Sequence, residues 1–554
     1  MKRSIAVIDC ETDPFRKGRV PAPFVWGYYN GSEYHQFLTA KKLAVFLSDR
    51  DEIVYAHNGG KFDFHYLLDE LEAWDDLMLI NGRIARCQIG MSELRDSFSI
   101  VPVSLDLATG RKEEIDYAIF EKNERTKKLN WDKITRYLKN DCVILWDLVS
   151  AFVNRFGPEL TVASAAMKQW RKVCDEKMEN TDEEFYNVIA PFYYGGRVEC
   201  FSSGVIDSDF SVYDINSAYP YAMLSKHPYS ANYQRASGYL RNADFVRICC
   251  RSRGSLPFRG LGGGDSGIFA GLSFPRDNDL REFTVTGWEY AAALETKSIT
   301  DVTVLESIRF MKHVDFKPYI YKFWGERQAA QKAGDILGSL FAKLMMNSLY
   351  GKFAANPDNY HNYMICPAKY IPVLVDADAA QDTDAQKRGL AYWEFAGELG
   401  PWALARRALD EHEKRYYNVA TGASITGYVR AMLWRAIHSS EGVLYCDTDS
   451  IAVKDAGRGV VLGDALGQWK HEGDFDRAGI AGKKLYIFRG AADINGKRIH
   501  KKASKGARLT DAELWKLARG GSVDYMPEVP TYSVNKAPHF TGRRIVNTTK
   551  KAAA

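Results

Sequence analysis

The 554-residue chain lacks the sequence patterns of several common classes of protein: disulfide-rich, zinc-binding, membrane-spanning, secreted and phosphate-loop proteins. Its nine cysteines are scattered and odd in number and include no Cys-x-x-Cys pair, which argues against a disulfide framework or zinc ribbon and favours a reducing, cytoplasmic compartment. No run of about 18 apolar residues occurs, and the first apolar run ends at Asp9, so we expect neither a membrane span nor a signal peptide. The glycine-rich run 260–267 is not followed by Gly-Lys-Ser/Thr, and it predicts a solvated loop rather than a phosphate cradle.

What the chain does have is 46% hydrophobic and 13% aromatic residues, enough for several packed domains. The net charge of +4 is unevenly distributed, because from Lys483 to the end sixteen Lys and Arg face five Asp and Glu. This basic segment on a body of opposite charge favours a polyanionic partner, with a solvated lysine-rich surface as the alternative.

Four acids gather in three segments of the first quarter. SIAVIDCETD predicts a buried strand that ends at Asp9 and Glu11, two positions apart and therefore on one face. VYAHNGGKFDFHYLL predicts a short strand, a glycine turn and a helix that opens beside Asp63. DKITRYLKNDCVILWDLVSAF has helical periodicity, which puts Tyr137 and Asp141 on one face.

Phosphodiester hydrolysis needs such a set of side chains. Carboxylates hold two Mg²⁺ ions, one that activates water and one that stabilises the leaving oxygen, and a tyrosine can orient the water. Asp9 and Glu11 alone could be ordinary surface acids, whereas four acids in these settings favour a metal site.

A second pair of acids lies in YCDTDSI, residues 445–451. If this run is one strand, Asp447 and Asp449 share a face, where two like charges at about 4 Å cost roughly 4 kcal/mol at an effective dielectric near 20. VYDINSAYPYAM predicts another strand, which carries Asp214 and breaks into a turn and a helix. Acids from two adjacent strands form a two-metal phosphoryl-transfer site, and the metals would supply the missing positive charge. An EF-hand is excluded, since the glycine and the closing glutamate are absent.

The segment AKLMMNSLYGKFAANP predicts a helix with a nucleotide-binding face. A basic residue, an amide, an aromatic ring and a glycine fall on one stripe: Lys343, Asn347, Tyr350 and Gly351. FWGERQAAQKAGD adds Arg327 and Lys332 on a preceding helix, as triphosphate contacts or as exposed helix charge.

The first three segments resemble the Exo I, Exo II and Exo III motifs of the 3′–5′ exonucleases in family B DNA polymerases. The resemblance implies that four residues are metal ligands: Asp9, Glu11, Asp63 and Asp141. It implies that Tyr137 positions the water and that Asn58 and Phe62 hold the single-stranded 3′ end. The segment HNGGKFD departs from many relatives by one additional residue between Asn58 and Asp63.

The later segments resemble polymerase motifs A (DINSAYP), B (KLMMNSLYGK) and C (YCDTDS) of the same family. The resemblance implies that Asp214 and Asp449 bind catalytic metals, that Asp447 supports them, and that Tyr219 excludes a ribose 2′-hydroxyl. Tyr350 would pack against the incoming nucleotide. KKLY (483–486) and YYGG (193–196) resemble the K-x-Y and Y-x-G-G motifs, which implies these DNA contacts: Lys484, Tyr486, Tyr193, Gly195 and Gly196. Lys502 and Lys505 then suit phosphate-backbone contact at the entrance to a small thumb.

The resemblance implies an α/β fold, with an N-terminal ribonuclease H-like 3′–5′ exonuclease domain and a right-hand polymerase of palm, fingers and thumb. The expected parts are the exonuclease 1–155, a helical connection 156–185, palm 186–225 and 415–482, a first palm insertion 226–312, fingers 313–357, a second insertion 358–414, and the K-x-Y motif with the thumb 483–554.

The Y-x-G-G motif and the length are most similar to protein-primed polymerases of small linear-genome phages, especially tailless membrane-containing ones. That branch implies a first insertion that contacts a terminal (priming) protein, and a second, irregular one that clamps DNA for strand displacement. It implies a monomer in the host cytoplasm that uses template and primer DNA, dNTPs and Mg²⁺ (two ions at each site, with Mn²⁺ as an alternative), and a single-stranded-DNA-binding protein as a further partner. Three alternatives remain: a nucleic-acid-primed replicase, a non-catalytic DNA-binding scaffold, and an exonuclease whose polymerase half only grips DNA.

Overall fold

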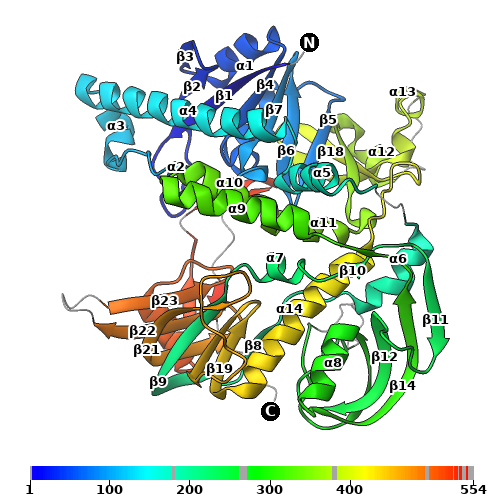
Figure 1. The fold of residues 1–554 in the computed structure, drawn as a ribbon. Helices are drawn as coiled ribbons and strands as arrows, with labels where there is room; N and C mark the ends of the chain where they lie inside the picture. The colour runs from blue at the N-terminus through cyan, green and yellow to red at the C-terminus, as the bar shows by residue number, and fades with distance from the viewer. Residues whose placement is uncertain are drawn as a thin grey trace.

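The structure, a computed structural model, describes residues 3–177, 181–260, 271–376, 383–492, 498–527, 529–533, 536–539 and 544–546. Figure 1 shows one large sheet above and a second sheet below, with helices α9 and α10 between them. Within the described ranges, no helix has the length and apolar character needed to cross a membrane. The predicted glycine-rich loop at 260–267 lies, apart from Gly260, outside the described residues.

The first strand lies inside a ten-stranded sheet and has both faces covered. Val7 packs into one hydrophobic core and Ala6 and Ile8 into another, because successive strand residues point to opposite faces. Burial on both sides explains why this run is apolar without alternation. Strand β1 runs parallel to β4 and antiparallel to β2, and helix α4 packs on β1 and β2. The elements are β1 (Ser4–Thr12), β2 (Pro23–Tyr29), β3 (Tyr34–Phe37), α1 (Ala40–Ser48), β4 (Glu52–Ala56), β5 (Asp76–Ile80), β6 (Arg83–Ile89), β7 (Ser92–Asp96), α2 (Leu105–Thr109), α3 (Lys122–Arg125) and α4 (Lys128–Phe156).

Residues 358–414, which the sequence predicts to be an irregular palm insertion, contain three strands that extend this first sheet. Strand β16 pairs with β5, and β18 and β17 continue the sheet to its edge. The prediction of irregular structure is wrong because Ile365 and Leu404 are buried in the same hydrophobic core as Ile8 of β1, a contact between distant segments. The acidic run 376–386 lies partly outside the described residues. The elements are β16 (His361–Pro367), α12 (Ile371–Val375), α13 (Thr383–Lys387), β17 (Glu394–Leu399) and β18 (Trp402–Ala408).

The second sheet has seven strands in the order β23-β22-β21-β9-β20-β19-β8 and carries motifs A and C. The first part of the segment expected to form the thumb belongs here, since β22 pairs with β21 and β23 pairs with β22. Helix α14 is buried along most of its length. The elements are β8 (Val198–Cys200), β9 (Gly204–Ile215), α7 (Ala218–Ala222), α14 (Val419–Ser439), β19 (Glu441–Asp447), β20 (Ser450–Asp455), β21 (Trp469–Gly482), β22 (Leu485–Ala492) and β23 (Arg498–Ser504).

The described part of the first insertion is a curved four-stranded sheet with helix α8 against it (Figure 1). Helix α8 packs on α14, which joins the insertion to the second sheet. The elements are β10 (His227–Pro228), β11 (Tyr233–Ser237), β12 (Phe245–Ser252), β13 (Leu280–Thr286), α8 (Gly287–Glu295), β14 (Ile299–Phe310) and β15 (His313–Val314).

Two packed helices, α9 and α10, form the finger-like part between the sheets, and α5 lies against both. After the second sheet the chain continues into a short helix and two small two-stranded antiparallel sheets. The elements are α5 (Val162–Cys174), α6 (Glu183–Ile189), α9 (Lys317–Ala333), α10 (Ile336–Ser348), α11 (Tyr350–Phe353), α15 (Asp511–Ala518), β24 (Val523–Tyr525), β25 (Thr531–Ser533), β26 (Lys536–His539) and β27 (Arg544–Val546).

Candidate active sites

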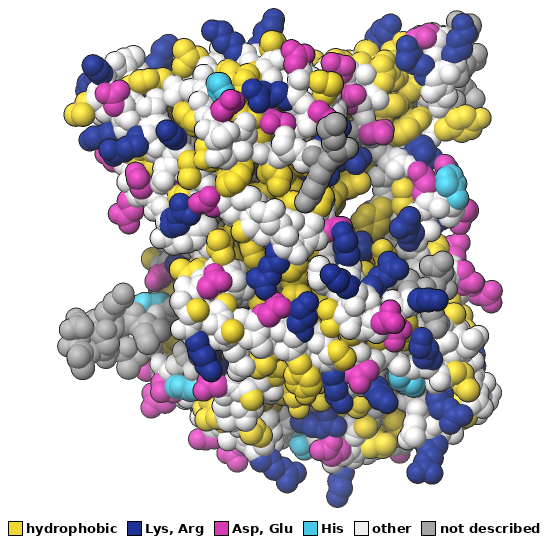
Figure 2. All heavy atoms as spheres, turned by 45° about the horizontal axis from the view of Figure 1, so that its top comes forward, with side chains coloured by type: hydrophobic (Ala, Val, Ile, Leu, Met, Phe, Trp, Pro, Cys, Tyr) yellow, Lys and Arg dark blue, Asp and Glu magenta, His cyan; other side chains and the backbone are white. Residues whose placement is uncertain are grey.

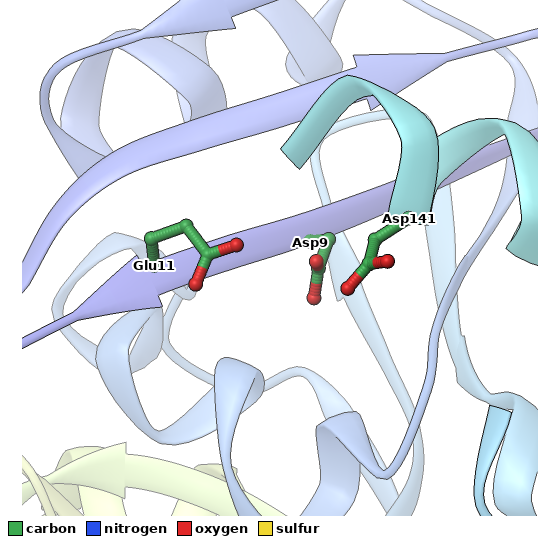
Figure 3. A group of neighbouring side chains, drawn as sticks. All are labelled: Asp9, Glu11 and Asp141. Carbon is green, nitrogen blue, oxygen red and sulfur yellow. The ribbon is translucent and has the colours of Figure 1, made fainter. Parts of the chain in front are cut away.

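Three of the four N-terminal acids meet where helix α4 crosses strand β1. One carboxylate oxygen each from Asp9, Glu11 and Asp141 lies within 4.8 Å of the other two. Figure 3 shows Asp9 and Glu11 on the same side of the strand, with Asp141 beside Asp9. Tyr137 lies one turn before Asp141 on the same helix. The spacings in the sequence therefore bring these side chains together.

The fourth acid, Asp63, opens a four-residue 3₁₀ helix, Asp63–Tyr66, so the predicted helical pattern is present as a 3₁₀ helix and not as an α-helix. Asn58 has a φ of +63°, a conformation that Asn tolerates better than most residues. A Cβ at Gly60 would lie 2.1 Å from the carbonyl oxygen of Ile84. The close approach of Gly60 to Ile84 accompanies successive tight turns over residues 59–66. Phe62, which precedes Asp63 in the chain, is half-buried.

The environment of these acids fits a divalent cation. Burial, followed by the charge of Asp141, raises the pKa of Glu11 to about 8, and burial raises the pKa of Asp63 to about 7. Burial and the neighbouring carboxylates also raise the pKa of Asp9 well above its usual range. Glu11 Oε1, Asp63 Oδ1 and Asp141 Oδ1 are buried and have no hydrogen-bond partner. Buried carboxylate oxygens without partners are costly, and they are the ligands that hard cations prefer.

A cation that the sequence analysis missed, Lys112, also lies in this site. Its Nζ atom is 2.9 Å from Asp141 Oδ2 and 5.3 Å from the centre of the Tyr137 ring. Burial alone would lower the pKa of Lys112, but Asp141 and Asp9 raise it above the usual value. The Tyr117 and Tyr137 hydroxyls are 3.2 Å apart. Lys112 stands in a charged segment without periodicity, so no local pattern could single it out.

In the second sheet, Asp447 and Asp449 do not lie on one strand, and that prediction is wrong. Asp447 ends β19 and pairs with Ser450 of β20, so Thr448 and Asp449 form the hairpin turn. Thr448 has a φ of +61°, which is strained for a β-branched residue. The Asp449 amide donates to the Asp447 carbonyl oxygen at 2.6 Å. The apolar run is thus interrupted by a turn that lacks glycine, proline and asparagine.

Asp214 reaches this turn from the neighbouring strand β9, where it pairs with Ser450. Burial, then the charge of Asp449, raises the pKa of Asp214 to about 7, and burial, then the charge of Asp447, raises the pKa of Asp449 to about 6. Among the described residues, however, only the N-terminal acids form a group with ligand atoms all within 4.8 Å. The three acids of this sheet are more widely spaced.

The positive charge beside Asp447 comes from Lys484 of the K-x-Y motif. Its Nζ atom lies 2.7 and 2.9 Å from the two Asp447 carboxylate oxygens, and its amide donates to the Tyr445 hydroxyl at 2.8 Å. Tyr486 is largely buried, with its ring centre 4.8 Å from that of Tyr445. The K-x-Y motif therefore packs directly on motif C.

The Y-x-G-G segment packs on the same turn. A Cβ at Gly196 would lie 2.8 Å from Thr448 Cγ2, whereas a Cβ at Gly195 would meet nothing within 4 Å. Arg430 of α14 donates to the carbonyl oxygens of Tyr194 and Gly195 at 2.6 and 2.9 Å. Tyr193, which precedes this pair, is half-buried.

Two of the residues predicted to bind the nucleotide, Tyr219 and Tyr350, form a stacked pair. The rings of Tyr219 and Tyr350 are 4.1 Å apart and nearly parallel, at 9°. The predicted helix is divided, because α10 ends at Ser348 and α11 starts at Tyr350, although Leu349 keeps helical angles. The other residues have different surroundings. Lys343 and Gly351 are exposed and Asn347 is half-buried, and the charge of Lys343 opposes part of the rise in the pKa of Asp214. Arg327 donates from Nη1 to Ser217 Oγ at 3.3 Å. Lys332 is exposed in the last turn of α9.

A second residue that the sequence analysis missed is Glu472 on β21. It pairs with Lys501, and its charge contributes to the raised pKa values of Asp214 and Asp449. The pairing of strand β21 with β9 brings Glu472 close to Asp214. The two residues are far apart along the chain, so no pattern in the sequence indicated this proximity. Of the predicted backbone-binding lysines, Lys502 pairs with Asp511 at 2.5 Å, and Lys505 is exposed. Figure 2 shows Lys and Arg side chains gathered across the middle of one face of the molecule.

Comparisons with known proteins agree with these observations. Residues 108–392 match the family model described as DNA polymerase type B, organellar and viral. The DNA-directed DNA polymerase of Enterobacteria phage PRD1 is 33% identical over 576 residues, covering 98% of each chain. The DNA polymerase of Bacillus phage phi29 is 25% identical over 400 residues, covering 67% of this chain and 61% of that one.

A solved structure of phi29 DNA polymerase has a TM-score of 0.73 and 18% sequence identity, and the match covers 99% of this chain and 100% of that chain. The predicted α/β fold class of a family B polymerase, the resemblance to phage polymerases and the class of enzyme, a DNA-directed DNA polymerase, are confirmed. Such enzymes depend on divalent metal ions. The chain therefore belongs to the type B DNA polymerases of the organellar and viral family.

Proposed function

We propose that the chain copies a DNA template at the acids of the seven-stranded sheet, removes misincorporated nucleotides at the acids of the ten-stranded sheet, and starts new strands on a priming protein. The observation that carries this proposal is the occurrence of two sets of acids at two separate sheets of one chain, a close and largely buried set at the ten-stranded sheet and a half-buried, more widely spaced set at the seven-stranded sheet. Bound at these acids, Mg²⁺ ions would supply a metal-activated water or 3′-hydroxyl and stabilise the leaving oxygen.

At the exonuclease site, four carboxylates would be the metal ligands: Asp9, Glu11, Asp63 and Asp141. Lys112 holds the Asp141 carboxylate by an ion pair, and the Tyr137 hydroxyl would orient the attacking water. Asn58 and Phe62 would hold the single-stranded 3′ end.

At the polymerase site, Asp214 and Asp449 would be the metal ligands, and Asp447 would keep Lys484 in place. The primer strand would pass Lys484 and Tyr486, because both lie next to the motif C turn. Tyr219 would act against a ribose 2′-hydroxyl, and Tyr350 would move from its stack to make room for the nucleotide. The remaining contacts with nucleotide and DNA would come from the other predicted residues: Arg327, Lys332, Lys343, Asn347, Tyr193, Gly195, Gly196, Gly351, Lys502 and Lys505.

Two observations support protein priming and strand displacement. The similarity to the PRD1 enzyme extends over 98% of both chains. The segments 226–312 and 358–414 have folded substructure of their own, one beside α14 and one at the edge of the exonuclease sheet. The first would contact the priming protein, and the second would enclose DNA. A replicase that uses only nucleic-acid primers is the alternative.

The test is extension of a primed single-stranded circle with dNTPs and Mg²⁺, by the wild type and by Asp449→Asn. Products longer than the circle, absent with the variant, would support both the metal site and strand displacement. Products that stop at full length would remove the displacement part, and no synthesis by the wild type would refute the proposal.

Protein priming needs a separate experiment. Unprimed linear template and labelled dNTP are added to an extract of cells that replicate the genome, with or without the purified chain. Label that becomes SDS-stable and protease-sensitive only when the chain is present supports priming from a Ser, Thr or Tyr hydroxyl. If primed synthesis occurs but no protein is labelled, the nucleic-acid-primed alternative holds.

A further inference from the structure

The connection between β1 and β2, residues 13–22, presents an exposed phenylalanine just after the strand that carries Asp9 and Glu11. Phe15 is 45% exposed, and no other phenylalanine in the described part of the chain is classed as exposed. It follows Glu11 by only four residues. Single exposed apolar side chains are common on protein surfaces, so the significance of Phe15 depends on what holds it and what it contacts.

The connection is held in place by several bonds. The Asp13 amide donates to the Ala22 carbonyl oxygen at 3.0 Å, and Arg125 pairs with Asp13 at 2.5 Å. Arg16 and Arg19 both pair with Glu121. Phe15 is therefore exposed on a fixed backbone, as a preorganised binding group would be.

Phe15 contacts Phe62, the residue that precedes Asp63. The two ring centres are 5.7 Å apart at an angle of 48°. Phe62 is in turn supported from behind by Tyr66 and Tyr532, with ring centres at 5.4 Å in each case. Phe15 and Phe62 thus form an aromatic surface whose outer part is open to solvent.

A chain of hydrogen bonds fixes this surface. The Tyr66 hydroxyl donates to the Pro21 carbonyl oxygen at 2.6 Å, and the Tyr532 hydroxyl lies 2.6 Å from the Tyr66 oxygen. Because Tyr66 has only one proton, Tyr532 must be the donor to it. Three segments far apart in the sequence therefore hold the two rings in one arrangement.

We propose that Phe15, together with Phe62, forms a stacking subsite for the unpaired bases at the 3′ end of a single-stranded DNA. The inference rests on the proposed exonuclease function and adds a substrate-binding residue to it. Aromatic rings stack on every base, which suits an exonuclease that must accept any terminal nucleotide. The guanidinium group of Arg16, which is exposed on the same connection, suits the phosphate backbone of that strand.

The test compares Phe15→Ala, Phe15→Leu and Phe15→Trp in digestion of a labelled single-stranded oligonucleotide. We expect Phe15→Ala and Phe15→Leu to raise KM about tenfold, the factor for 1.4 kcal/mol, with kcat within about twofold, since stacking is lost but the acids stay. Phe15→Trp should keep the wild-type KM. Val45→Ala, which removes an exposed apolar side chain from α1 of the same domain, is the matched control.

A second readout does not depend on cleavage. A 3′-terminal 2-aminopurine, whose fluorescence is quenched by stacking, is titrated in EDTA with the wild type and the three variants. Quenching should be weaker with Phe15→Ala and Phe15→Leu and retained with Phe15→Trp.

The possible failures can be told apart. If the wild type does not digest the oligonucleotide at all, the proposed exonuclease fails. If the wild type digests it but KM and quenching are unchanged in Phe15→Ala, or if leucine serves as well as tryptophan, the stacking subsite is refuted and the exonuclease stands. Primer extension, which we expect to be unchanged in all three variants, verifies that each one folds.

Discussion

A methyl group at Gly196 should impair polymerisation much more than the same group at Gly195, where it would meet no protein atom and could affect only the proposed DNA contact. At position 196 the Cβ would lie 2.8 Å from Thr448 Cγ2, 3.0 Å from its Oγ1 and 3.2 Å from its Cβ. At position 195 the space within 4 Å is empty. The two neighbouring glycines thus provide a perturbation and its matched control in one motif.

The size of the effect follows from how firmly Thr448 is held. Its φ of +61° is strained, and its amide donates to the Arg197 carbonyl oxygen at 2.6 Å, so the turn has little freedom to withdraw. Carbon atoms prefer separations of about 3.5–4.0 Å, so the turn or the Y-x-G-G segment must move by about 0.7 Å. Overpacking of this kind costs about 1–3 kcal/mol, and a 1 Å displacement of catalytic groups can cost about 10²-fold in rate. We expect Gly196→Ala to lower the rate of primer extension by about 10- to 100-fold.

The assay is single-nucleotide primer extension under single-turnover conditions, with digestion of a single-stranded oligonucleotide as the internal control. Digestion should stay within about twofold, because the acids proposed for the exonuclease site lie in the other sheet. Thr448→Ser removes the nearest atom, Cγ2, so adding it to Gly196→Ala should recover about tenfold of the loss. Equal losses in Gly195→Ala and Gly196→Ala, or no recovery in the double variant, would refute the steric argument.

Three further predictions concern single titratable side chains. Lys484→Met should lower the rate of primer extension about 5- to 30-fold, because Asp447 loses the cation that pairs with it, and Lys484→Arg should lower the rate less. Digestion of a single-stranded oligonucleotide should be unchanged, since Lys112 still pairs with Asp141, and an equal loss of digestion would contradict this prediction. Lys112→Met should lower exonuclease activity at least tenfold and leave primer extension unchanged, since Asp141 loses its ion pair; an unchanged digestion rate would show that the pair is dispensable. Burial lowers the pKa of His227 to about 4, so below pH 6.5 the unfolded chain binds a proton that the folded chain does not, and stability falls as the pH falls. At pH 5 the loss in the free energy of unfolding due to His227 is about 2 kcal/mol. The Tm of His227→Gln should therefore fall less between pH 7.5 and 5 than the Tm of the wild type. Equal falls in Tm would assign the acid sensitivity to other groups.

Local pattern was sufficient where the chain itself brings the residues together. The spacing of Asp9 and Glu11 on one strand and of Tyr137 and Asp141 on one helix predicted which side chains share a face, and the structure has them so. The strand at Asp214 and the helix after it also follow from the apolar run and the turn residues. In these cases the period of the backbone alone determines the direction of the side chain.

Local pattern failed where a turn lacked the usual turn residues. YCDTDSI has the composition of a strand, but it reverses direction at Thr448, which takes up a left-handed conformation. The turn is stabilised by distant residues. The Arg197 carbonyl oxygen accepts the Thr448 amide and Lys484 pairs with Asp447, while Gly196 has no side chain and so leaves room for Thr448. Propensity is a weak guide where such tertiary contacts outweigh it.

The sequence by itself thus determined the two sets of acids, the order of the motifs and the fold class. Only the tertiary structure decided that Lys112 and Glu472 join those acids, that residues 358–414 extend the exonuclease sheet, and that Phe15 meets Phe62 beside Asp63. The physical reason is the range of the interactions. Periodicity and turn chemistry act over a few residues, whereas ion pairs, strand pairing and ring contacts join segments that only the packing of the whole chain brings together.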